Sequence, residues 1–563
     1  MTRDSSSVVE QNRLLSKLLS LSLANSSTST DDLLVQVSDQ VPAGRGLVFT
    51  RRIEAGQAVL TLPVDTLINV KSYKSFLHPD TLPSSVSIAS SENKGKSDQR
   101  LSSAQLLSLL LARAQLELES GRKRTSAETT SKYEALQLFV QTLPDKFDTV
   151  PLTWSLLARR FGHVGELKEA SWKQRFFRSL LQALPPHSQD LQGKVRQRFE
   201  RDWLGLCTLR DSNCDLLAEP ALLSSNPDLA RALVRAIDLD TFLWAWLCVN
   251  SRCVFLPLGL ADHADNFTLA PMLDMANHTS DPAFECKVRY AVDGGLEMYA
   301  PGGSNDDACV AMPGDECFIT YGPHSNESLL SEYGFVLPAH LTFGRDREAD
   351  GESTWRGSRY VDVLMDAHVE RLLQKQGVDG EAKIELLQNR GYWGEFTVHP
   401  YPEPAHPSHR LILALRLAAL DLCSITPSTP PKVAKVKAQS GVKAGKKVPF
   451  HAQQETSDLE RWEETLTGYR DTISDENEQQ ARDILVELCT ARRKDTDKAR
   501  QYLAAAEDIL QSHCDNSETT TDNQIEPDYN GCKLSLAFVQ QLLDEEEAVL
   551  RLVTQAARDQ VEW

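Results

Sequence analysis

Strand and helix patterns occupy different parts of this chain. Strand-like apolar runs lie at Gly46–Thr50 and Ala58–Leu62, and apolar and polar residues alternate at Phe284–Tyr290 and Leu296–Ala300. An Asp-Gly-Gly segment joins the last two runs, and because it tolerates positive φ it predicts the turn of a β-hairpin. Cys317–Tyr321 then reads as a short buried strand that delivers a tyrosine to a loop edge.

Apolar residues at spacings of three and four predict helices in the rest of the chain. The pattern is present at Asn12–Ala24 and Leu101–Leu118, and the apolar part of Phe242–Leu256 suits a buried helix. From about residue 343 onward the helices dominate, at Val361–Gln376, His409–Leu422, Glu476–Lys494, Asp497–Gln511 and Leu534–Ala557. We therefore expect an α+β fold in which a mixed domain is followed by an all-α C-terminal domain.

Composition sets the domain organisation. A length of 563 residues predicts more than one domain. We expect a polar leader with a short helix at 1–33, a mixed domain at 34–340 and a helical domain at 341–563. Two polar stretches, about 427–455 and 512–528, are predicted to be disordered breaks in the last domain. The sequence leaves open whether the Lys-rich part, 432–447, directs nuclear import.

Charge and cysteine content exclude several classes of function. The net charge of −19 argues against nucleic acid as a direct partner and favours a basic protein partner. Eleven scattered cysteines, without a C-x-x-C pair, predict reduced thiols and no metal site. The N-terminus lacks a signal-peptide pattern and no apolar run reaches the roughly 18 residues of a membrane span. We expect a cytoplasmic or nuclear monomer without a membrane partner.

Candidate chemistry gathers between Leu269 and Phe335. The dipeptides Asn277-His278 and Tyr321-Gly322 each lie at the edge of an apolar run, where side chains are positioned and still reachable. Upstream, Arg252 ends an apolar segment, and a buried guanidinium needs a partner such as Asp274. Near the N-terminus, the segment Gly44-Arg45-Gly46 permits a tight turn and a close approach of a ligand.

The segments DMANH, ITYG and NESLLSEYGF, which begin at residues 274, 319 and 326, resemble SET-domain protein methyltransferases. The resemblance is to the branch of Rubisco large-subunit methyltransferase. It implies a knot-like cofactor site, a helical insertion at about 100–245, a catalytic part at 250–335 and a C-terminal substrate-binding domain. It also implies S-adenosyl-L-methionine (AdoMet) as cofactor.

The resemblance further assigns a role to each candidate residue. Tyr321 is implied as the catalytic residue. A lysine must lose its proton before it attacks a methyl group, and a tyrosine with a pKa near ~10 orients the amine rather than acting as a strong base. The implied substrate channel is lined by Val254, Leu256 and Phe335. The implied cofactor-binding residues are Gly44, Arg45, Gly46, Arg252, Asp274, Asn277, His278 and Tyr333.

We therefore expect an AdoMet-dependent protein-lysine N-methyltransferase that acts on a basic, non-histone protein. Two alternatives stay open, a protein-histidine methyltransferase and a non-catalytic interaction protein with a SET fold. Val254 disfavours the first, because it offers no hydrogen bond to an imidazole at a position where the resemblance expects a polar group. The presence of both Tyr321 and Asn277 disfavours the second.

Overall fold

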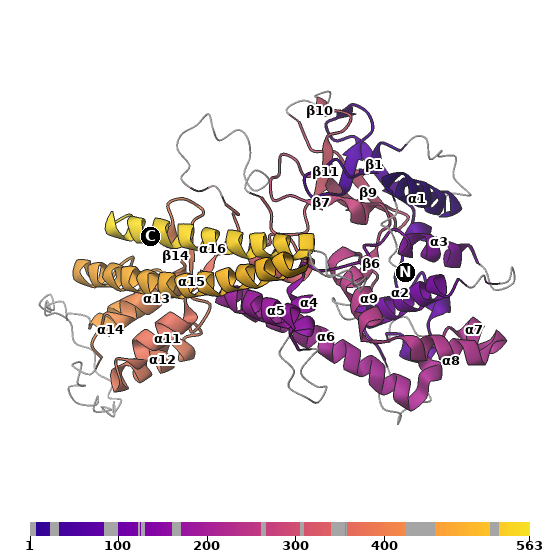
Figure 1. The fold of residues 1–563 in the computed structure, drawn as a ribbon. Coiled ribbons are helices and arrows are strands. Elements are labelled where there is room, and N and C mark those ends of the chain that lie inside the picture. The colour runs from indigo at the N-terminus through magenta and orange to yellow at the C-terminus, as the bar shows by residue number, and fades with distance from the viewer. Residues whose placement is uncertain are drawn as a thin grey trace, which may run out of the picture. The chain divides into compact units, whose positions relative to one another are not determined.

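The protein is described here from a computed structural model, in which the α+β class is confirmed (Figure 1). The structure describes residues 7–22, 33–83, 100–121, 124, 130–159, 171–260, 266–303, 309–338, 355, 357–422, 457–517 and 529–563. The chain divides into two compact units. The first comprises Met1–Leu184, Ser188–Tyr360 and Leu503–Gln540, and the second comprises Pro185–His187, Val361–Tyr502 and Gln541–Trp563.

A four-stranded sheet in the first unit brings together distant parts of the sequence. Its order is β1-β2-β11-β7, with β1 at Val35–Ser38, β2 at Gly46–Phe49, β11 at Glu316–Ile319 and β7 at Asn277–His278. β11 pairs antiparallel with β2 and parallel with β7. The segment after Gly44-Arg45, the Asn-His dipeptide and the strand before Tyr321 are therefore neighbours in one sheet.

The other sheets of the first unit are smaller. β4 (Ala58–Leu62), β9 (Leu296–Tyr299) and β8 (Lys287–Tyr290) form a three-stranded sheet, and the predicted hairpin is the β8–β9 pair. Its turn contains Gly294 at φ +87°, a conformation that glycine adopts without strain. Two-stranded sheets pair β10 with β3 and β5 with β6, at Cys309–Ala311, Ile53–Glu54, Cys253–Phe255 and Phe267–Leu269.

Helices make up the rest of the first unit. The buried α2 (Ser103–Glu119) begins with a capping box between Ser102 and Gln105, which satisfies amide groups that a helix start leaves unpaired. It packs against α9 (Leu239–Arg252), which leads directly into β5. The remaining helices are α1 (Val8–Ser22), α3 (Ser131–Val140), α4 (Pro151–Arg159), α5 (Trp172–Ala183), α6 (Pro186–Asn213), α7 (Pro220–Ser225), α8 (Pro227–Ala236) and α10 (Asn326–Tyr333), with short 3-10 helices at η2 (Val64–Thr66), η3 (Lys74–Phe76), η4 (Pro79–Thr81), η5 (Cys214–Leu217) and η7 (Leu273–Met275).

The second unit is mainly helical but carries a small sheet, so the expected all-α C-terminal domain needs correction. The sheet joins β12 (Val363–Leu364), β13 (Thr397–His399) and β14 (His406–Pro407), which are too short to give an alternating pattern in the sequence. The helices are α11 (Asp366–Gln374), α12 (Val378–Asn389), α13 (His409–Ala418), α14 (Asp458–Leu466) and parts of two long helices, α15 (Asp475–Ser517) and α16 (Tyr529–Arg558).

Three predictions of helices and breaks in the C-terminal region need correction. The helix expected at Val361–Gln376 begins only at Asp366, because Val363–Leu364 form strand β12. The helices expected at Glu476–Lys494 and Asp497–Gln511 are one continuous helix, α15. At the expected junction, the Thr496 hydroxyl donates to the Arg492 carbonyl one turn earlier, and the helix continues through this residue. The predicted break at 512–528 is also too long, since α15 continues to Ser517. The rest of that break and the break at 427–455 lie outside the described residues.

The domain limits at 34–340 and 341–563 stay a prediction, because residues 339–354 are outside the described part of the chain. Among the described residues, none of the helices combines the length and the apolar character that a membrane span requires.

Candidate active site

The two polar dipeptides meet through the parallel pairing of β7 with β11. Asn277 lies opposite Phe318 and His278 opposite Ile319, and the Thr279 amide donates to the Ile319 carbonyl at 3.0 Å. One step further, the Tyr321 amide donates to His278 Nδ1 at 3.1 Å. The two rings stack at a centroid distance of 5.1 Å. A hydrogen bond and ring stacking thus hold together His278 and Tyr321, which are 43 positions apart in the sequence.

Tyr321 is held by its hydroxyl as well as by its backbone. The hydroxyl donates to the Ala276 carbonyl at 2.8 Å, so its proton points at the protein and its oxygen lone pairs remain available to a ligand. Tyr333 packs 5.1 Å and Phe335 6.2 Å from the Tyr321 ring, centroid to centroid. Burial raises the pKa of Tyr321 well above its ordinary value and that of Tyr333 to about 12, so both stay phenols.

His278 is neutral at physiological pH. Burial, helped by the charge of His324, lowers the pKa of His278 to about 4. Because Nδ1 accepts a hydrogen bond from Tyr321, the single proton of the neutral ring lies on Nε2. Within the described chain this buried Nε2 has no hydrogen-bond partner. Buried donors are rarely left unpaired, and a ligand is one way to satisfy this one.

A side-chain clip fastens the glycine loop to this pair of strands. Asn277 Nδ2 donates to the Arg45 carbonyl at 2.8 Å and to Glu316 Oε1 at 2.7 Å. Gly46 makes the close approach possible, since a Cβ there would lie 2.5 Å from Asn277 Nδ2 and 2.8 Å from Glu316 Oε1. Gly44 has φ +83°, which favours glycine at that turn.

A buried ion pair lies beside the clip. Arg252 Nη1 donates to Asp274 Oδ2 and to the Asp274 carbonyl, both at 3.0 Å, and the Asp274 side chain is fully buried. Arg252 Nε and Asp274 Oδ1 are buried without a partner in the part of the chain that the structure describes. Burial raises the pKa of Asp274, and the charge of Arg252 opposes that shift. The structural pairing of Arg252 with Asp274 is present, and it leaves the guanidinium with unused donors.

A second guanidinium lies within electrostatic range of the first. Burial lowers the pKa of Arg45, and the charge of Arg252 lowers it further, although Asp145 and Asp39 act in the opposite direction. Two half-buried arginines that repel each other suit an anionic group such as a carboxylate.

Nearby, Met272 has φ +75°, an unusual conformation for a residue other than glycine, just before Asp274. Strain of this kind is concentrated at functional sites.

The structure thus brings most of the predicted site residues into one cluster. Asn277, His278 and Tyr321 share hydrogen bonds or ring contacts with Arg45, Tyr333 and Phe335. Val254 and Leu256 instead follow Arg252 on or just after β5, where Val254 pairs with Thr268 and Leu256 lies in the hydrophobic core. The roles assigned to individual residues stay predictions.

Sequence reasoning missed two parts of the cluster. Glu316 is the acceptor of the clip, and its signal was a carboxylate at the start of an otherwise apolar strand. The Ala276 carbonyl holds the Tyr321 hydroxyl. A backbone carbonyl leaves no trace in residue type, so this contact had no signal in the sequence.

Comparison with known proteins gives partial matches to methyltransferases. The chain is 27% identical over 162 residues to ribosomal lysine N-methyltransferase set11 of Schizosaccharomyces pombe, covering 29% of this chain and 33% of that protein. It is 30% identical over 199 residues to SET domain-containing protein 4 of Mus musculus, with 35% and 39% covered. For ribosomal lysine N-methyltransferase 2 of Saccharomyces cerevisiae the values are 29% over 182 residues, with 31% and 33% covered.

These matches confirm the predicted similarity to SET-domain lysine methyltransferases over the aligned residues. The chain spans a third to two fifths of the length of these relatives. No family model matches the chain. Among solved structures, the SET domain of LSMT bound to lysine and AdoHcy aligns over 98% of this chain and 92% of its own, with 16% identity and a TM-score of 0.47. Rubisco LSMT bound to sinefungin and monomethyllysine gives the same values.

Proposed function

We propose that this chain is an AdoMet-dependent protein-lysine N-methyltransferase. The observation that carries the proposal is the buried cluster in which Tyr321 is held by His278 and Ala276 beside the Asn277 clip and two arginines. Relatives that match part of the chain are named lysine N-methyltransferases, which supports the same reaction.

The residues present fit AdoMet. Its carboxylate suits Arg252, whose Nε is buried without a partner in the described chain, together with Arg45. His278 Nε2–H is a buried donor, and a nitrogen or oxygen of the cofactor can accept a hydrogen bond from it. The Asn277 amide nitrogen is used within the protein to hold the Arg45 loop, and its predicted role in cofactor binding stays a prediction. When bound, AdoMet supplies an electrophilic methyl group on a sulfonium.

Tyr321 is suited to orient an amine rather than to remove its proton. Its own proton is committed to the Ala276 carbonyl, so the hydroxyl oxygen can accept a hydrogen bond from a lysine amine. The aromatic rings of Tyr333 and Phe335 pack against it and give it an apolar surrounding. Removal from water favours the neutral form of a lysine, which is the form that attacks a methyl group. Orientation and desolvation are therefore the contributions of this cluster.

The substrate is proposed to be a protein that carries the target lysine. The proposal rests on the names of the relatives. The basic character of that protein, the monomeric state and the lack of a nucleic-acid partner, all expected from the sequence, remain proposals.

Methyl transfer from labelled AdoMet into a cell lysate tests the function, with mass spectrometry to identify the modified residue. We expect Tyr321→Phe to reduce labelling about a hundredfold, the loss that misplacement of a reacting group can cause, while AdoMet binding by calorimetry is retained. Tyr73→Phe is the matched control, since Tyr73 is buried and its hydroxyl also donates to a backbone carbonyl, that of Lys132 at 3.0 Å. Label on histidine, or no AdoMet binding, would contradict the proposal.

A further inference from the structure

A large cavity opens beside the tyrosine cluster in the first unit. Its volume is about 1040 Å³, at the upper end of the range for ligand pockets. Tyr333 and His324 lie in its wall, and both touch Tyr321, through a ring contact at 5.1 Å and through a hydrogen bond of His324 Nε2 with the Tyr321 carbonyl at 3.1 Å. The cavity therefore borders the candidate active site and is larger than a lysine side chain needs.

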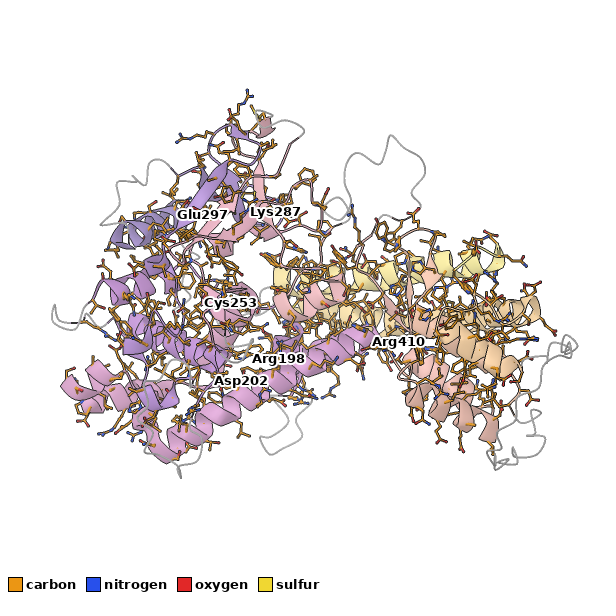
Figure 2. All side chains as sticks on the ribbon, turned by 180° about the vertical axis from the view of Figure 1, so that it is seen from behind. Arg198, Asp202, Cys253, Lys287, Glu297 and Arg410 are labelled. Carbon is orange, nitrogen blue, oxygen red and sulfur yellow. The ribbon has the colours of Figure 1, made fainter. Side chains whose placement is uncertain are left out.

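Three elements build most of the wall. They are the start of α2, the middle of α6 and the end of α9. In Figure 2, Arg198 and Asp202 are labelled along α6 and Cys253 directly after α9, and all three residues line the cavity. The apolar part of the lining is Leu101, Ala104, Leu204, Leu209, Trp246, Val249 and Phe267. The side chain of Leu204 is 66% exposed, so an apolar surface is offered at the rim.

Positive side chains outnumber negative ones in the lining, and both carboxylates are bound within the protein. The lining holds three arginines and two carboxylates. Glu332 Oε2 is already paired, with Arg198 Nη2 at 2.5 Å and with Asn250 Nδ2 at 3.0 Å. The Asp202 side chain is nearly buried and accepts from Trp246 Nε1 at 3.0 Å. The carboxylates are therefore engaged by the protein itself.

Arg201 is an accessible cation of the lining, which also holds the exposed Arg100 and Arg198, the partner of Glu332. Its side chain is 74% exposed, and its contact with Asp202 is long, 3.5 Å from Nε to Oδ1. The planar guanidinium therefore keeps terminal donors that suit a carboxylate. In a chain of net charge −19, a cavity wall with an excess of arginine departs from the overall charge.

We infer that this cavity receives the stretch of the substrate protein next to the target lysine, and that an aspartate or glutamate in that stretch binds Arg201. The inference rests on the proposed methyltransferase function and refines its substrate class. It differs from the basic substrate expected from net charge, because the local lining rather than the whole chain meets the residues beside the lysine. Apolar side chains of the same stretch would cover Leu204.

Synthetic peptides with one lysine in a Gly/Ser background test the inference. One series carries a single Asp at each position from three before to three after the lysine, and a matched series carries Arg. Binding is measured by fluorescence anisotropy with S-adenosylhomocysteine present, and KM and kcat by methyl transfer. We expect at least one Asp peptide to bind about tenfold more tightly than the neutral peptide, as one charge-assisted hydrogen bond would give.

Charge reversal provides the decisive comparison. Arg201→Glu should abolish that preference and favour Arg at the same position, with a change in KM and little change in kcat. Arg13→Glu, on α1 and outside the cavity lining, is the matched control and should leave the preference intact. A preference for Arg peptides in the unaltered protein, no charge preference, no peptide binding, or an equal effect of both variants would overturn the inference while AdoMet binding still supports the proposed function. Loss of AdoMet binding in the unaltered protein would overturn both.

Discussion

Replacement of Asn277 by alanine tests whether the clip on the Arg45 loop serves cofactor binding. The substitution removes two hydrogen bonds, one to the Arg45 carbonyl at 2.8 Å and one to the Glu316 carboxyl at 2.7 Å. A neutral hydrogen bond contributes about 1 kcal/mol and one to a charged group about 1.5 to 3 kcal/mol. We therefore expect the free energy of unfolding to fall by about 3 kcal/mol.

Part of this loss should appear in cofactor affinity. The clip fixes the backbone around Gly46, and in the variant the cofactor must order that loop at its own cost. If about half of the stabilisation is involved, the Kd for AdoMet rises about tenfold. Calorimetry measures the Kd, and urea denaturation measures the stability of the same samples.

The matched control is Asn477→Ala. Asn477 is also a buried asparagine whose amide donates to a backbone carbonyl, that of Arg416 at 3.0 Å, and it belongs to the second unit. The Asn477→Ala variant should have a lower free energy of unfolding and an unchanged Kd for AdoMet. If Asn277→Ala loses stability and still binds AdoMet with an unchanged Kd, the clip is only structural and the reasoning fails.

Two other predictions concern the buried charges. Asp274→Leu should lower the free energy of unfolding by about 3 to 5 kcal/mol, because it leaves the Arg252 guanidinium buried without its carboxylate partner. Urea denaturation should show that the double variant Asp274→Leu/Arg252→Met recovers most of this stability. AdoMet binding should be lost in the double variant. His278 has a pKa of about 4 in the folded protein against its ordinary 6.5, so the unfolded state takes up the proton first as the pH falls. Stability should drop between pH 6.5 and 4 by up to about 3 kcal/mol. His278→Gln should show less of this drop in urea titrations at several pH values, and an identical pH dependence in both proteins would contradict the assignment of a neutral His278.

The sequence predicted which residues gather in one cluster better than the contacts between them. Periodicity located the hairpin and several of the helices, among them α2, α13 and α16, and the motif at residues 274–278 lies within the cluster. The clip joins Asn277 to Arg45, 232 positions earlier. Such a pairing depends on how β2, β11 and β7 are ordered in the sheet, and periodicity within one strand carries no information about that order. The continuity of α15 was not predicted for a different reason. The polar residues at 495–498 are typical of a junction between two helices, although the backbone there is helical.

The proton inventory of the cluster narrows the chemistry that it can perform. His278 is neutral with its one accepting nitrogen occupied by the Tyr321 amide. Tyr321 and Tyr333 keep their protons, since burial raises the pKa of both. None of these three groups is therefore a ready acceptor for the proton of a lysine ammonium at neutral pH. For the proposed reaction we infer that the proton leaves to solvent before the amine is enclosed, and that the cluster then holds a neutral amine in place. Because the cavity beside Tyr333 borders the site, we expect it to offer that proton a route to water before a substrate chain fills it.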